Sequence, residues 1–163
     1  MKYVNFCLIV IITFALSAGS VNTRVPYEGY YPGELIPDLV LSDLQGNKLQ
    51  LHDYKGKKVV VNFWASYDAR SRAANVRLHN ILKAMDADAV FLSVSFDENR
   101  NVVERTMALD NMETVFLFCE TNGNRSTLYK ELNLEKGFRN YLIGENGEIA
   151  AMNVNPEDLK NLF

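Results

Sequence analysis

The chain has 163 residues, of which 48% are hydrophobic and 23% are charged. This length and balance predict one globular domain with a hydrophobic core and exclude extended disorder. The formal net charge is −3 and no run of lysine or arginine stands out, so nucleic acid is not an expected partner. The two histidines, His52 and His79, lack the local spacing of a metal site, and we expect both to be structural. No metal or other cofactor is expected.

The first 20 residues have the order of a secretory signal peptide. Lys2 is followed by the apolar run Phe6–Leu16 and then by the small residues Ser17–Ser20. Cleavage after Gly19 or after Ser20 fits this order. We therefore expect an exported bacterial protein that is periplasmic or otherwise extracytoplasmic and is not inserted in the membrane.

The same segment has a second interpretation. No charge interrupts residues 3–23, so an uncleaved segment would be apolar enough to anchor the chain in a membrane. With cleavage, the chain divides into a signal peptide over residues 1–20, a lead-in linker over residues 21–33 and a single domain over residues 34–163.

Hydrophobic patterns along the domain predict alternating strands and helices. One run, residues 57–64, is almost wholly apolar and rich in β-branched residues, as in a strand buried on both faces. Apolar residues then recur at i, i+3, i+4 and i+7, which predicts a helix. The expected elements in chain order are a hairpin (38–42 and 48–51), a strand (57–64), a helix (70–85), a strand (89–95), a helix (101–109), a strand (114–119), a helix (126–132), a second hairpin (140–143 and 148–151) and a helix capped by Asn155. This order predicts an α/β fold with a mixed central sheet and helices on both faces.

Three ordered blocks of the sequence resemble one protein family. They are Ile36–Gly46, Leu51–Lys57 and Val61–Ser66, and Tyr141–Ile149 resembles the closing hairpin of the same family. The family is that of the TlpA-like extracytoplasmic thioredoxins, which are close to the AhpC/TSA peroxiredoxin group. The resemblance covers most of the predicted domain and implies a thioredoxin-like fold with an N-terminal β-hairpin.

The resemblance breaks at the catalytic residues. The family carries Cys-x-x-Cys at the start of the first long helix, where the helix N-terminus stabilises a thiolate and the second cysteine resolves the mixed disulfide. In this chain Asp68 and Ser71 occupy those two positions. Neither can exchange disulfides, whereas Asp68 can cap the helix. We therefore expect no catalytic dithiol.

Two further family features are absent. Many TlpA-like members have a glutamate three residues after the second cysteine, where this chain has Ala74. The family also has a cis-proline before the last hairpin, where this chain has Phe138. Because a cis bond before a non-proline residue costs about 2.5–4 kcal/mol, we expect the Gly137–Phe138 bond to be trans. The peroxidatic cysteine of the peroxiredoxin group, at the start of the same helix, is missing as well.

The chain has two cysteines, Cys7 in the predicted signal peptide and Cys119. A mature chain with one cysteine cannot form an internal disulfide. Cys119 ends an apolar strand, which favours a small buried hydrophobic residue. The alternative is an accessible redox thiol, which would give a weak thiol–disulfide oxidoreductase or peroxidase-like activity.

Side chains around the former catalytic positions are candidates for binding, because pockets in α/β sheets form at the carboxyl ends of strands. By this analogy of fold, the candidates are Trp64, Tyr67, Asp68, Arg70 and Phe138. Arg72 and Arg77 extend the charged cluster, which could also be a solvated helix face. We expect a redox-inactive module that binds an unidentified protein, peptide or small ligand through this face. A structural subunit of an envelope assembly is a further possibility.

Overall fold

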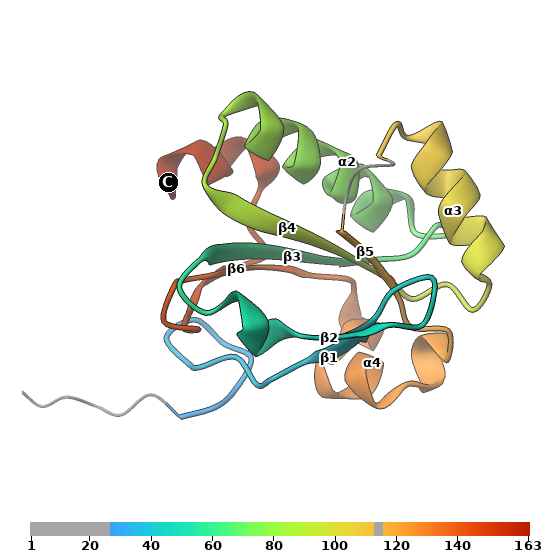
Figure 1. Cartoon of the computed structure of the whole chain (residues 1–163), viewed down its shortest axis with the longest axis horizontal. Coiled ribbons are helices and arrows are strands. Elements are labelled where there is room, and N and C mark those ends of the chain that lie inside the picture. Colours follow the sequence, from blue (N-terminus) through green and yellow to red (C-terminus); the bar gives the residue numbers. More distant parts are fainter. Residues whose placement is uncertain (1–26, 113–115) are drawn as a thin grey trace, which may run out of the picture.

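A computed structural model describes residues 27–112 and 116–163 (Figure 1). The predicted signal peptide over residues 1–20 lies outside the described residues, as does the first part of the predicted linker. None of the helices in the described part of the chain has the length and apolar character that a membrane crossing requires.

A five-stranded sheet forms the centre of the domain, with the strand order β5-β4-β3-β6-β7. Its strands are β3 (Lys58–Trp64), β4 (Ala89–Ser95), β5 (Phe116–Cys119), β6 (Asn140–Ile143) and β7 (Ile149–Met152). The first three are parallel, and β6 and β7 run antiparallel to their neighbours. Strand β3 is paired on both sides and buries six of its seven residues, which explains its continuous apolar sequence.

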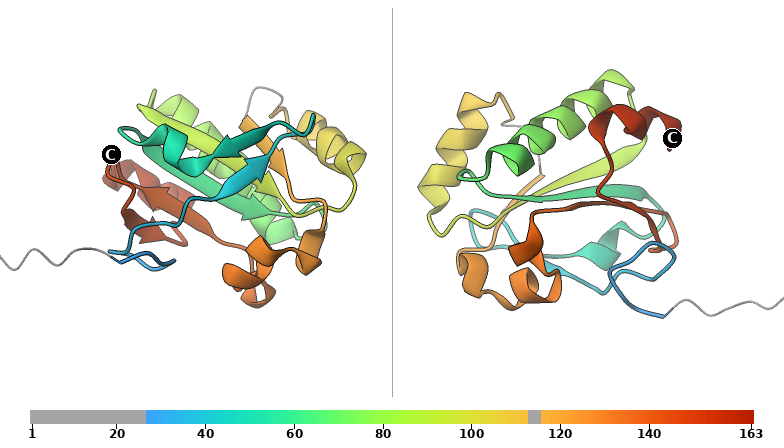
Figure 2. Two further views of the ribbon diagram at one scale, coloured as in Figure 1. Left: turned by 60° about the horizontal axis from the view of Figure 1, so that its bottom comes forward. Right: turned by 180° about the vertical axis from the view of Figure 1, so that it is seen from behind.

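Helices and a hairpin cover the two faces of this sheet (Figures 1 and 2). One face carries α2 (Ala69–Ala84), α3 (Arg100–Leu109) and the terminal 3-10 helix η4 (Pro156–Asn161). The other face carries the hairpin β1 (Val40–Ser42) and β2 (Lys48–Gln50), together with α4 (Thr127–Glu131). Short 3-10 turns are η1 (Leu51–Tyr54), η2 (Gly123–Arg125) and η3 (Leu134–Lys136). Each face has its own hydrophobic cluster, so the sheet is buried on both sides.

This arrangement confirms the predicted thioredoxin-like α/β fold with its N-terminal hairpin.

The last helix differs in kind from the prediction. Asn155 caps it and Pro156 begins it, as expected, but the segment is a 3-10 helix. A piece of six residues offers few i→i+4 hydrogen bonds, and 3-10 turns are frequent in such short segments. The strand predicted over residues 114–119 is described from Phe116 onward.

The segment before residue 34 is attached to the domain and is not a free linker. The Gly33 N–H donates to the Ile149 carbonyl at 2.9 Å, and the Ile149 N–H donates to the Glu34 carbonyl at 2.9 Å. The Tyr30 hydroxyl also donates to Glu131 at 3.2 Å. Pairing with the edge strand β7 is made by backbone groups, which composition does not reveal. Among the described residues, the folded domain therefore begins earlier than the predicted boundary at residue 34.

Four buried polar side chains connect β3, β4 and α2. The Trp64 Nε1–H donates to Ser93 Oγ at 2.8 Å, and the Ser93 hydroxyl donates to Asn75 Oδ1 at 3.1 Å. The Asn62 amide donates to the same Asn75 oxygen at 3.0 Å. All four side chains are almost fully buried, so their polar groups depend on one another for hydrogen bonds. This network fixes α2 against the sheet beneath the former catalytic positions.

Removing the Ser93 hydroxyl should test this network. Ser93→Ala leaves the Trp64 N–H buried without its acceptor, and we expect the free energy of unfolding to fall by about 1–3 kcal/mol. Urea denaturation followed by far-ultraviolet circular dichroism measures the change. Ser42→Ala is the control, because Ser42 makes no side-chain hydrogen bond among the described residues. Equal losses in the two variants would show that the network does not stabilise the fold.

Candidate functional site

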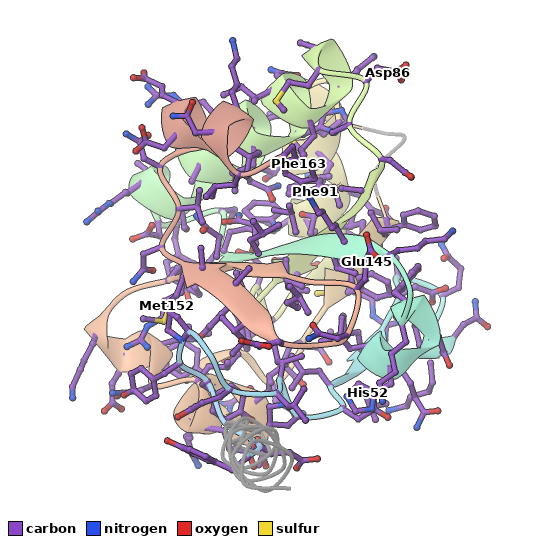
Figure 3. All side chains as sticks on the ribbon, turned by 90° about the vertical axis from the view of Figure 1, so that its left-hand side faces the viewer. His52, Asp86, Phe91, Glu145, Met152 and Phe163 are labelled. Atoms are coloured by element: carbon purple, nitrogen blue, oxygen red, sulfur yellow. The ribbon has the colours of Figure 1, made fainter. Side chains whose placement is uncertain are left out.

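The start of α2 lies at the carboxyl end of β3, at the right of Figure 1. Asp68 is the N-cap residue, and its Oδ1 accepts a hydrogen bond of 2.7 Å from the Ser71 N–H. The Ser71 hydroxyl donates to the Asp68 carbonyl at 3.2 Å and accepts from the Ala65 N–H at 3.4 Å. Asp68 and Ser71 therefore both satisfy backbone groups at the helix start. Figure 3 shows the opposite end of the sheet, marked by Asp86 after α2 and by Glu145 in the β6–β7 turn.

A buried carboxylate holds the loop that precedes Asp68. Asp97 is 5% exposed and follows β4 in the chain. Its carboxylate accepts hydrogen bonds from the Ser66 N–H at 2.9 Å, the Ser66 hydroxyl at 2.6 Å and the Ser95 hydroxyl at 2.7 Å. Hydrogen bonds to an ionised acceptor are stronger than neutral ones, so this loop has a fixed path. Tyr67, which follows Ser66 in the chain, is directed outward and is 68% exposed.

An aromatic cluster lies beside this loop. Tyr67 contacts Phe138 with ring centroids 6.3 Å apart. Phe138 also contacts Tyr129 at 6.2 Å and Phe96 at 6.0 Å, so the half-buried ring is fixed by neighbours on three sides. Partial burial raises the pKa of Tyr67, and the nearby Tyr129 and acidic side chains add to the shift. The phenol is therefore neutral at physiological pH and can act as a hydrogen-bonding aromatic contact.

The peptide bond between Gly137 and Phe138 is trans, and the described residues contain no cis peptide bond. Gly137 has a φ of 123°, a conformation that strongly favours glycine. Among the described residues, neither the N–H nor the C=O of Phe138 has a hydrogen-bond partner. The segment before β6 therefore offers free backbone groups next to an aromatic side chain.

A groove of about 850 Å³ runs between α2 and this segment. Its α2 wall includes Asp68, Arg70, Ala73, Ala74 and Arg77. The opposite wall is formed by residues 136–140 and 153–156. The groove thus brings the former catalytic positions together with the chain around Phe138.

Two of the predicted binding residues do not lie on this surface as expected. Trp64 is fully buried, and its indole N–H is used by Ser93, so it cannot contact a ligand in this structure. Its alternating position on β3 turns it toward the core under α2. Arg72 forms a two-pronged ion pair with Asp110 of the segment after α3, at 2.6 and 2.8 Å, and points away from the groove. The predicted charged cluster is therefore divided between two sides of the helix.

Cys119 lies in the core. It is 3% exposed, and its thiol donates to the Asp97 carbonyl at 3.3 Å. Burial raises the pKa of the Cys119 thiol to about 11, and the Asp97 carboxylate adds to the shift. The thiolate is the reactive form of cysteine, so burial and the raised pKa both disfavour reaction of this thiol near neutral pH.

The two histidines have separate structural contacts. The His79 ring lies 5.9 Å from the Phe91 ring, and burial followed by the Lys83 charge lowers the pKa of His79. His52 Nε2 is 3.2 Å from the Ile36 carbonyl. In residues 27–112 and 116–163, no group of three or more potential ligands is arranged for a metal ion.

Sequence reasoning did not find Asp97 or its two serine partners. A signal exists, because Ser95 and Asp97 alternate directly after a buried strand, where side chains reach the carboxyl edge of the sheet. That pattern is short and common. Ser66 comes next to Asp97 because β3 and β4 pair in parallel and end at the same edge of the sheet.

A second hollow, of about 680 Å³, lies between the β1–β2 hairpin, α3 and β5. It is mainly apolar and is lined by Leu44, Met107 and Met112 among others. None of the predicted site residues borders it.

The parallel β3–β4–β5 unit, the antiparallel β6–β7 hairpin and the helix that begins at the end of β3 define a thioredoxin-like protein. The sequence model of the AhpC/TSA family matches residues 32–152, and the chain belongs to this family. The match covers the central sheet, α2, α3, α4 and the Phe138 segment.

Relatives of known name include thioredoxin-like thiol–disulfide oxidoreductases. The thiol-disulfide oxidoreductase ResA of Bacillus cereus is 34% identical over 70 residues, which are 39% of this chain and 40% of ResA. The thioredoxin-like protein YneN of Bacillus subtilis is 26% identical over 77% of this chain and 73% of its own length. The crystal structure of a thioredoxin-like protein from Parabacteroides distasonis has 38% identity and a TM-score of 0.72, and the match covers 83% of this chain and 96% of that one. The alignment with ResA thus spans less than half of that protein.

Cysteines introduced at positions 68 and 71 should have thiol reactivity if the start of α2 stabilises a thiolate. In Asp68→Cys/Ser71→Cys we expect Cys at position 68 to titrate below its ordinary pKa of about 8.5, because the helix N-terminus favours the thiolate. The pH dependence of iodoacetamide alkylation measures this pKa. Asp68→Ser is the control, since serine can still cap the helix but adds no thiol. A pKa at or above the ordinary value would contradict the prediction.

Proposed function

We propose that this chain is an exported thioredoxin-fold protein that has no dithiol chemistry and binds an extended peptide segment of a partner protein. The binding face is the groove between α2 and the segment around Phe138. The observation that carries the proposal is the use of Asp68 and Ser71 as helix-capping residues at the two positions where the family has cysteines.

The shape and chemistry of the groove support a peptide ligand. An extended chain needs partners for its backbone, and the free N–H and C=O of Phe138 can supply them. Tyr67 and Phe138 add exposed and half-buried aromatic surface of the kind enriched at interfaces. The free backbone groups of Phe138 and the exposed Tyr67 ring contribute little to the stability of the fold itself.

Export is part of the proposal and depends on residues 1–20, whose order of charge, apolar run and small residues is that of a signal peptide. Extracellular or periplasmic location is compatible with the cysteine content, because the sole cysteine after residue 20 has no partner for an internal disulfide.

The alternative, weak redox activity through Cys119, is disfavoured by geometry. The thiol is buried, it donates to a carbonyl, and burial raises its pKa to about 11. Reaction with a disulfide would require local unfolding around β5.

Insulin reduction in the presence of dithiothreitol tests the first part of the proposal. The mature protein should leave the rate of insulin precipitation at the reductant-only value, because no nucleophilic thiol lies at the helix start. An ordinary thioredoxin provides the positive control. Catalysis at a comparable rate would falsify the redox-inactive assignment.

Alkylation of Cys119 tests the alternative separately. In the native protein at pH 7–8 the thiol should react at least about 100-fold more slowly than in the urea-unfolded chain, because burial both shields it and raises its pKa. Maleimide labelling followed by mass spectrometry measures both rates. Rapid native labelling, with any redox activity lost in Cys119→Ala, would favour the one-cysteine mechanism instead.

A further inference from the structure

The groove beside α2 carries positive charge on a protein that is acidic overall. The chain has 20 acidic and 17 basic residues, yet Arg70, Arg77 and Lys136 all line this groove. Asp68 is the one carboxylate among the lining residues, and it accepts the hydrogen bond from the Ser71 N–H. Arg139 is a fourth basic residue of the lining, and within the described residues none of the four forms an ion pair.

Arg70 stands where a cation is unfavourable for the fold. It lies in the first turn of α2, and the positive end of the helix dipole disfavours cations there. Arg72, in the same turn, is compensated by its two-pronged ion pair with Asp110. Arg70 has no carboxylate partner among the described residues. A side chain that opposes the helix dipole without such compensation is expected at a functional position.

The spacing of these residues along α2 places Arg70 and Arg77 on one face of the helix. Positions 70, 73, 74 and 77 follow the spacing i, i+3, i+4 and i+7 and share one face of the helix. The small side chains Ala73 and Ala74 lie between Arg70 and Arg77 on the α2 wall of the groove, and the two arginines are about 10 Å apart along the helix axis. Lys136 faces them from the opposite wall, one residue before Gly137.

We propose that the partner segment bound in this groove is acidic, with carboxylate side chains placed against Arg70, Arg77 and Lys136. This inference rests on the proposed peptide-binding function and adds the charge of the ligand. In an extended segment, residues two apart point the same way and lie about 6.6 Å apart, so carboxylates two or four positions apart can reach both arginines.

Three fluorescein-labelled peptides test the charge preference. Each is about eight residues long, the length of a long strand, with Glu, Lys or Gln at alternate positions and the same residues between them. Fluorescence anisotropy with the mature protein should show the Glu peptide binding at least about tenfold more tightly than the Lys peptide. The preference should shrink as salt is raised, because exposed charges are screened.

Charge reversal in the groove supplies the matched variants. Arg70→Glu/Arg77→Glu should weaken binding of the Glu peptide about tenfold and strengthen binding of the Lys peptide. Glu in the first turn of a helix is favourable, so the fold is preserved, and circular dichroism verifies it. The control is Arg105→Glu, which makes the same kind of charge change at an exposed position of α3 outside the groove and should leave all three affinities unchanged.

The outcomes separate the two proposals. Binding of all three peptides with equal affinity overturns the acidic preference but leaves peptide binding intact, whereas binding of none overturns peptide binding itself. If inorganic phosphate displaces the Glu peptide as effectively as excess unlabelled peptide does, the groove is a site for small anions and the acidic-peptide inference fails. Equal weakening by Arg105→Glu would show a long-range charge effect and would also overturn it.

Discussion

The hydrogen bond between the Asp68 carboxylate and the Ser71 N–H is the contact on which this end of the molecule depends. A helix that starts directly at the end of a buried central strand leaves its first N–H groups at the surface, and something must accept from them. The Asp68 side chain does so at the helix end where an acidic side chain is most favourable. The buried Ser71 hydroxyl adds two hydrogen bonds to the same turn, one to the Asp68 carbonyl and one from the Ala65 N–H. The polar backbone groups at the start of α2 are therefore hydrogen-bonded to side chains of the same segment.

This self-sufficiency changes what the surrounding residues can do. The loop before Asp68 is tied to the buried Asp97, which also sets the direction of Tyr67. The thiol of Cys119 is buried and donates to the backbone carbonyl of the same Asp97. What remains available at the surface is a set of aromatic rings, free backbone groups at Phe138 and basic side chains along the groove. These groups are the ones on which the proposed binding function rests.

Most of the fold could be predicted from the sequence, because the signals for it are local. The apolar run of β3, the helical spacing of α2 and the turn residues of the hairpins are each visible within a short window, and the family blocks set their order. The attachment of residues 27–33 to β7 could not be predicted, because it is made by backbone hydrogen bonds that any sequence can form. The 3-10 form of η4 could not be predicted either, because the N-cap and the proline that start it occur in both α-helices and 3-10 helices.

The site was less predictable than the fold. Asp68, Ser71 and Phe138 could be found because family positions marked them. The prediction that Trp64 contacts a ligand is wrong for this structure, where the side chain is buried. Closeness to the helix start along the chain does not reveal on which side of β3 a side chain lies. The separate roles of Arg70 and Arg72 likewise depend on Asp110, which is distant in sequence and is brought to Arg72 only by the packing of α3.

The buried position of Trp64 has a consequence for spectroscopy. It is the only tryptophan of the chain, and it is enclosed between α2 and the sheet with its N–H held by Ser93. Its emission therefore originates from a dry and rigid environment below the groove. Tryptophan fluorescence of this protein thus reports the unfolding of its core.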